Sequence, residues 1–162
     1  MSIRLVSVLA GLVLVVAQGR VAVTEAVGPL AAKCVVTKNY DDQSQRTLNV
    51  YVGNLIIDPQ TQQVNASARY EDPATGELGA GSMRLDPSGT LMPVQMVMTG
   101  SPAVGNATRQ RTIRFQGTLN RSTLALSNLS GDQSSLITSG MSFTLQVRTF
   151  TGTGQCGLAE DP

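Results

Sequence analysis

The chain has 162 residues, which is the length of one domain, with 12 Lys and Arg, 11 Asp and Glu, and no histidine. The lack of histidine excludes Ser-His-Asp and Cys-His catalytic sites and every metal site built on imidazole. The near-neutral net charge gives no indication of nucleic acid or of a strongly anionic membrane as a partner.

The N-terminal residues predict a signal peptide over 1–19. Arg4 supplies a short positive segment, residues 5–16 are almost wholly apolar, and small residues follow. A membrane-spanning helix needs ~20 apolar residues, so this run is short for one. An uncleaved membrane anchor is the alternative, and it is the only route by which we expect a membrane contact. We therefore predict a secreted or periplasmic protein, with a lead-in segment at 20–33 before the folded part.

The only two cysteines, Cys34 and Cys156, stand at opposite ends of the remaining chain. In an exported protein the simplest expectation is a disulfide between them. It would close a β domain over residues 34–157 and leave a tail at 158–162. Bridged cysteines bring their strands together, so the first and last strands must be neighbours. This favours a sheet that closes on itself.

Alternation of apolar and polar residues with a period of two predicts strands along almost the whole domain. In chain order the predicted strands cover residues 34–38, 46–57, 64–70, 77–85, 91–98, 110–119, 122–129 and 141–150. The slip of the alternation near Gly53 suggests a bulge. Pro93 suggests a strand edge or a second bulge.

Turn signals separate these strands at regular intervals. Asp-Pro pairs begin at Asp58, Asp72 and Asp86, each 14 residues after the last, and such pairs favour chain reversals. The polar stretch at 131–140 predicts the longest connection, with room for one short helical turn. About eight strands with so little helix indicate an all-β fold, a single antiparallel domain of the meander type that forms a barrel or a sandwich.

The alternation also predicts which side chains face inward. The strand at 110–119 turns Ile113 and Phe115 toward the core, and the same pattern at 141–147 predicts an inward row of Met141, Phe143, Leu145 and Val147. The residues that we expect to line the interior are Met83, Met96, Met98, Phe115 and Phe143.

Two further sets of residues are candidate sites. No acidic residue occurs between Pro87 and Gly131, and this span holds four arginines, Arg109, Arg111, Arg114 and Arg121. Solvated arginines are the simpler interpretation, and an anion-binding or partner-binding patch is the alternative. Four asparagines have the form of N-glycosylation acceptors, which applies only in a eukaryotic secretory pathway: Asn65, Asn106, Asn120 and Asn128.

These patterns favour a protein that is not an enzyme. The acidic residues Glu71, Asp72 and Glu77 cluster at a turn, where solvated side chains are the usual role, and we expect no catalytic residue, metal or cofactor. The function that we predict is a binding or structural accessory module that meets an unknown protein partner through its outer surface. The alternative is a lipocalin-like carrier that holds a small apolar ligand inside the barrel.

Overall fold

The computed structural model describes residues 32–101, 103–104 and 107–158. The predicted signal peptide, most of the lead-in segment and the end of the tail lie outside the described residues. The strands are β1 (Ala32–Tyr40), β2 (Gln45–Ile57), β3 (Val64–Asp72), β4 (Glu77–Leu85), β5 (Leu91–Gly100), β6 (Ala103–Val104), β7 (Ala107–Asn120), β8 (Ala125–Ser139) and β9 (Ser142–Leu158).

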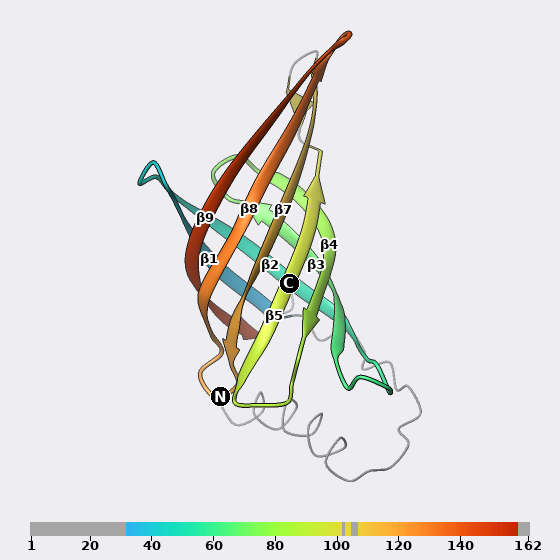
Figure 1. The fold of residues 1–162 in the computed structure, drawn as a ribbon, viewed down its shortest axis with the longest axis vertical. Coiled ribbons are helices and arrows are strands. Elements are labelled where there is room, and N and C mark those ends of the chain that lie inside the picture. The colour runs from blue at the N-terminus through green and yellow to red at the C-terminus, as the bar shows by residue number, and fades with distance from the viewer. Residues whose placement is uncertain (1–31, 102, 105–106, 159–162) are drawn as a thin grey trace.

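Eight of these strands form a closed antiparallel barrel (Figure 1). The order is β1-β2-β3-β4-β5-β7-β8-β9, and β9 returns to pair with β1. Strand β6 is a two-residue strand that pairs only with β7. The described residues contain no helix, and therefore no helix that is long and apolar enough to cross a membrane. The predicted all-β meander is therefore confirmed, and it is a barrel.

The predicted disulfide is present and lies at the closure of the barrel. Cys34 on β1 is directly opposite Cys156 on β9, and their Cα atoms are 3.9 Å apart. The bond thus joins the first and last strands of the meander. It is consistent with an extracellular or periplasmic location.

All three Asp-Pro turns form as predicted. The backbone amides of Gln60, Ala74 and Ser88 each donate to the carboxylate of the aspartate two positions earlier, at 2.8–3.0 Å. This is the Asx geometry that makes aspartate a turn residue. The expected bulge is also present, because the register of β2 against β3 shifts between Gly53 and Ile56. Pro93 lies beyond the last pair between β4 and β5, so its missing N–H breaks no ladder bond there.

The core is the barrel interior, which is filled by side chains from every long strand. Methionines take much of the space that aromatic residues would otherwise occupy, because the chain has no tryptophan and few other aromatics. Of the predicted lining residues, Met83, Met96, Met98 and Phe115 are buried there, together with Met92, Tyr70 and Phe150.

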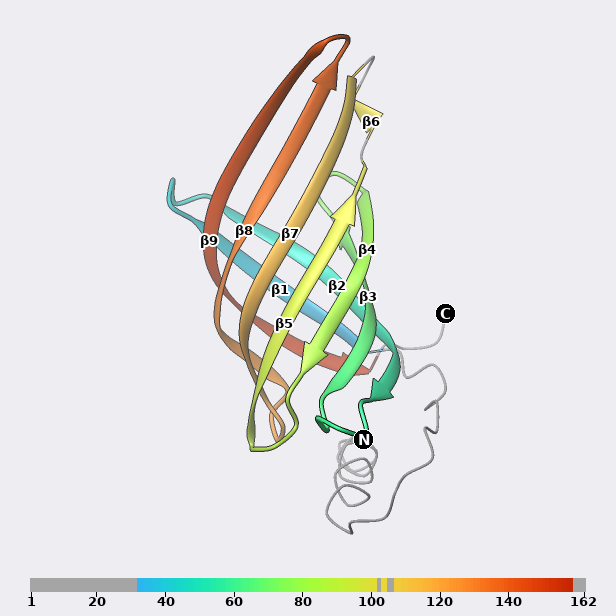
Figure 2. The ribbon, with the colours of Figure 1, turned by 45° about the vertical axis from the view of Figure 1, so that its right-hand side comes forward.

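Strands β8 and β9 are longer than predicted. Residues 131–140, expected to form a polar connection, continue β8 as far as Ser139, and only Gly140 and Met141 separate it from β9. The last pair between β9 and β1 is Phe150 with Tyr40. Residues 132–149 therefore form a β-hairpin that rises past the end of β1, with β7 paired along β8 as far as Thr138 (Figures 1 and 2). We call residues 132–149 the extension.

Candidate functional site

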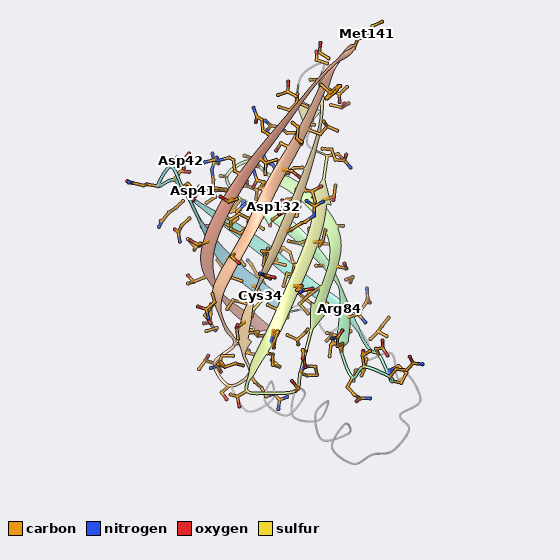
Figure 3. The ribbon with its side chains drawn as sticks, viewed as in Figure 1. Cys34, Asp41, Asp42, Arg84, Asp132 and Met141 are labelled. Atoms are coloured by element: carbon orange, nitrogen blue, oxygen red, sulfur yellow. A yellow bond between two sulfur atoms is a disulfide. The ribbon has the colours of Figure 1, made fainter. Side chains whose placement is uncertain are left out.

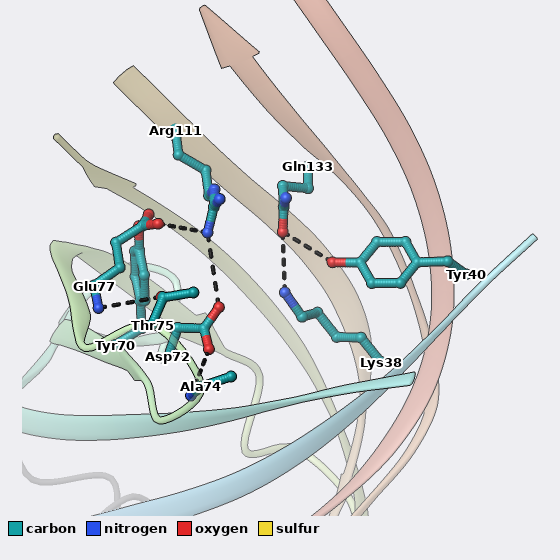
Figure 4. A network of polar contacts seen from close by, with 9 residues as sticks. All are labelled: Lys38, Tyr40, Tyr70, Asp72, Ala74, Thr75, Glu77, Arg111 and Gln133. Atoms are coloured by element: carbon teal, nitrogen blue, oxygen red, sulfur yellow. Dashed lines mark hydrogen bonds and ion pairs between the residues drawn. The ribbon is translucent and has the colours of Figure 1, made fainter. Parts of the chain in front are cut away.

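Polar side chains gather inside the barrel (Figure 4) at the rim, which is the end where the β1–β2 and β3–β4 turns lie and from which the extension rises (Figure 1). Lys38, Asp72, Glu77 and Ser135 are all at most 6% exposed. Buried charges are costly unless they are paired, so their partners decide what this cluster can do.

Arg111 on β7 pairs with both buried carboxylates. Its Nη1 lies 2.5 Å from Oε2 of Glu77 and 3.7 Å from Oδ2 of Asp72. The Tyr70 hydroxyl donates to the other Glu77 oxygen. Burial, reinforced by this bond to a carboxylate, raises the pKa of Tyr70, so the phenol stays protonated and keeps donating.

Two glycines determine where the Tyr70 ring lies. A Cβ atom at Gly79 would overlap Cε1 of Tyr70, and one at Gly100 would overlap its hydroxyl oxygen. The ring therefore rests against the wall over β4 and β5, in space that any larger residue would fill. This placement brings the hydroxyl to Glu77.

Lys38 on β1 belongs to a second set of contacts at the rim. We call the two sets together the rim cluster, which consists of Lys38, Tyr40, Tyr70, Asp72, Glu77, Arg111 and Gln133. Its Nζ donates to Oε1 of Gln133 on β8, which also accepts from the Tyr40 hydroxyl. Nζ also lies 5.5 Å and 5.6 Å from the ring centroids of Tyr40 and Phe150. Burial lowers the pKa of Lys38 from 10.5 to about 8, partly offset by the nearby Asp72 carboxylate.

The rim cluster is electrically balanced, with two cations and two carboxylates, and its contacts connect β1, β3, β4, β7 and β8. In the described part of the chain, no group of three or more acidic, cysteine or histidine side chains is placed to hold a metal ion. Through Gln133, which accepts from Lys38 and Tyr40, the cluster ties the base of the extension to β1. One signal in the sequence could have revealed this cluster. Lys38 follows Cys34 and Val36 at alternate positions of β1 and so faces the interior with them, and the sequence analysis did not use this pattern.

The extension has the opposite polarity to the barrel. Inside the barrel Phe150 faces the core, and alternation along β9 then turns Phe143, Leu145 and Val147 to the outer face. They are 77%, 62% and 59% exposed. The predicted inward row is therefore wrong, and Phe143 does not line the interior. Cross-strand pairing places Leu136 of β8, 36% exposed, opposite Leu145 on the same outer face.

The inner face of the extension is polar apart from Ile137, which shares the parity of Gln133 and Ser135. It carries Gln133, Ser135, Gln146 and Arg148, in continuity with the rim cluster. Arg148 is held by the Asp42 carboxylate of the β1–β2 turn, and its guanidinium lies 4.1 Å from the ring centroid of Tyr40. Met141, at the hairpin turn, is fully exposed (Figure 3). The exposed large apolar side chains of the extension thus lie on its outer face and at its tip, and the half-buried Ile137 is the large apolar residue of the inner face.

One edge of the extension is unpaired among the described residues. Strand β9 pairs with β8 throughout residues 142–149, but β1 ends at Tyr40, opposite Phe150. The β1–β2 turn then accepts side-chain hydrogen bonds from Arg148, at Asp42 and Ser44, and from Thr149, at Asp41. On the other side of the sheet, β6 covers the corresponding end of β7.

The structure separates the four candidate arginines. Arg109 and Arg111 belong to the inner side of β7, as their parity with the buried Ile113 predicts, whereas Arg114 lies outside and pairs with Asp132 at 3.4 Å. Arg121 lies at the far end of the barrel, where its guanidinium donates to the carbonyl of Pro87. The four residues therefore do not form one surface.

The candidate glycosylation sites also differ in setting. Asn65 lies within β3, and Asn128 is exposed beside the register shift of β8. The Asn120 side chain accepts backbone hydrogen bonds from Ser122 and Thr123 in the β7–β8 turn. Asn106 lies outside the described residues.

Comparison with known proteins identifies no relative. No family model matches this chain, and no curated protein or solved structure is detectably similar to it.

Proposed function

We propose that this protein is an exported, non-enzymatic binding module that docks a partner polypeptide through the outer face of the extension. The observation that supports this most strongly is the reversal of polarity along β9, which turns Phe143, Leu145 and Val147 to solvent. The rest of that strand follows the usual rule, with Thr149, Thr151 and Thr153 outside and Phe150 inside.

The physical argument concerns what these side chains contribute to the free protein. Side chains that remain 59–77% exposed contribute little to the free energy of folding, because they bury little apolar surface. Full burial of a residue of this size is worth ~1.5–3 kcal/mol. Neighbouring exposed apolar side chains on a rigid sheet are typical of a protein-interaction surface. The rim cluster supports this role because it holds the base of the extension in place.

The alternative is a lipocalin-like carrier of a small apolar ligand. It receives less support, because Tyr70, Met92, Met96, Met98, Phe115 and Phe150 occupy the barrel interior. A bound ligand would have to displace some of these side chains. Native mass spectrometry of protein purified from its source tests this directly, since a carrier would retain a small-molecule adduct.

The docking proposal is tested with a variant that keeps the strand but removes its apolar face. Phe143→Thr, Leu145→Thr and Val147→Thr, made together, preserve β-propensity. The matched control carries Val35→Thr and Val97→Thr, two residues of the barrel wall that are 41% and 44% exposed. Proteins captured from the source organism's exported fraction are identified by quantitative mass spectrometry, and each one lost with the triple variant is then purified.

We expect the purified partner to bind wild type and the control equally and the triple variant ~100-fold more weakly, since ~1.4 kcal/mol corresponds to a tenfold change in Kd. Equal binding to all three proteins would contradict the proposal. So would a partner whose binding is lost only with the control.

A further inference from the structure

We propose that the free edge of β9 pairs with the same edge of a second copy of this chain, in an antiparallel register centred on Leu145. The inference rests on the proposed function in taking the extension as the contact surface. It goes further by naming the edge as a second contact and an identical chain as its occupant.

The backbone of β9 presents hydrogen-bonding groups along this edge. The β8–β9 turn has two residues, Gly140 with φ of +59° and Met141, between the paired Ser139 and Ser142. In such a hairpin the flanking residues bond to each other, and the bonding then alternates along the strand. The N–H and C=O groups of Phe143, Leu145 and Val147 therefore point away from β8, toward the open side.

The edge lacks the features that normally prevent strand pairing. Natural edge strands are protected by proline, by charged side chains, by bulges or by a covering segment. Residues 142–147 contain no proline, glycine or charged residue, and their pairing with β8 shows no register shift. By contrast, the corresponding end of β7 is covered by β6. Among the described residues of the extension, the unprotected edge is that of β9.

The sequence of this edge is complementary to itself. With Leu145 opposite Leu145 of the second copy, Phe143 lies opposite Val147, and the outward-pointing backbone groups of all three residues meet as hydrogen-bonded pairs. Aromatic and β-branched residues pair favourably across strands. Arg148 lies opposite Ser142, so no like charges meet. A shift of two residues in one direction would place Phe143 opposite the polar Thr149, and in the other it would place Val147 opposite Met141, which lies in the turn beyond the last paired residue.

Pairing in this register would join β7, β8 and β9 of the two copies into one continuous sheet. The rows of Phe143, Leu145 and Val147 from both copies would lie side by side on one face, together with Leu136. The apolar surface that we assign to a partner would thereby double. The two barrels would lie at opposite ends of the joined sheet, because the strands are antiparallel.

The test uses the two-fold axis of the proposed dimer, where Leu145 of one copy lies opposite Leu145 of the other. Leu145→Lys and Leu145→Glu each place like charges opposite one another, while an equimolar mixture of the two places opposite charges there. Val97→Lys is the matched control, on the outer wall of β5 between two paired strands. Sedimentation velocity of each purified protein, with its disulfide formed, reports the monomer–dimer equilibrium.

We expect wild type and the Val97→Lys control to dimerise with the same Kd. Each single charge variant should dimerise about tenfold more weakly or worse, and the mixture should recover a heterodimer. A wild type that stays monomeric up to millimolar concentration would overturn the inference, as would equal dimerisation of all variants. The partner-binding assay is separate from this one. If the wild type is monomeric and the triple threonine variant still loses the partner that the wild type binds, this inference fails and the proposed function stands.

Discussion

Replacing Lys38 by methionine should remove a pH dependence of stability that the buried ammonium imposes. Lys38 is 1% exposed, and its pKa falls from 10.5 to about 8 in the folded protein. At ~1.4 kcal/mol per pKa unit, keeping the amine charged at pH 7 costs the folded state about 3 kcal/mol. The unfolded chain binds more protons between pH 8 and 10.5, so stability must rise with pH across that window.

We expect the free energy of unfolding of the wild type to rise by about 2 kcal/mol from Lys38 between pH 7 and 9.5. Lys38→Met should lack this rise. At pH 7 it should be more stable than wild type by about 2 kcal/mol, which is the relieved cost minus ~1 kcal/mol for the lost bond to Gln133. The Tyr40 hydroxyl still donates to Gln133 in the variant.

The assay is equilibrium unfolding in urea at constant ionic strength, with the disulfide intact, followed by circular dichroism. The upper limit of pH 9.5 keeps the measurement below the pH at which the tyrosines titrate. Burial raises the folded-state pKa of Tyr40 and Tyr70, so the stability that their protonated forms contribute is lost as pH rises above about 10. Lys33→Met is the control, because Lys33 and Lys38 are the only lysines and Lys33 lies on the outer wall. A flat wild-type profile, or one with the same slope in Lys38→Met, would refute the reasoning.

Three further perturbations test other parts of the fold by urea unfolding. Reduction of the disulfide, whose cysteines are separated by 122 positions, should lower the free energy of unfolding by about 5 kcal/mol, and a protein of unchanged stability would contradict this. Gly100→Ala should cost at least ~2 kcal/mol because the added Cβ atom meets the Tyr70 hydroxyl and the backbone carbonyl of Leu78, whereas Gly157→Ala, where an added Cβ atom would meet nothing within 4 Å, should be neutral. Arg111→Met should cost ~3–5 kcal/mol because it leaves two buried carboxylates without their cation; a loss below ~1 kcal/mol would show that the pairing contributes little.

The sequence predicted the fold well where the signals were local. Alternation along residues 110–119 placed Phe115 in the core, and the three Asp-Pro pairs formed turns because an aspartate and the residues that follow it settle that geometry alone. The pairing of Cys34 with Cys156 followed from there being no other cysteine. These features need no knowledge of distant neighbours.

The extension could not be predicted in the same way. Alternation shows that two faces of a strand differ, but it does not show which face meets the core. In β9 that choice depends on Phe150, which packs against Tyr40 of β1, so Phe143 takes the outer side. Residues 131–140 lacked a clear alternation because both faces of β8 there carry polar residues. The rim cluster joins residues from five strands, and such proximity has no local signal.

The closure between β1 and β9 gives the chain an almost circular organisation. Each other strand of the barrel pairs with the strands before and after it, so β1–β9 is the single seam between segments distant in sequence. Because closing a hairpin costs less entropy than joining the two distant ends, we expect the seam to form last. Because the bridged cysteines lie 3.9 Å apart, a short linker between them could replace the native ends. The chain could then be opened in the β4–β5 turn, giving a circular permutant with the same barrel.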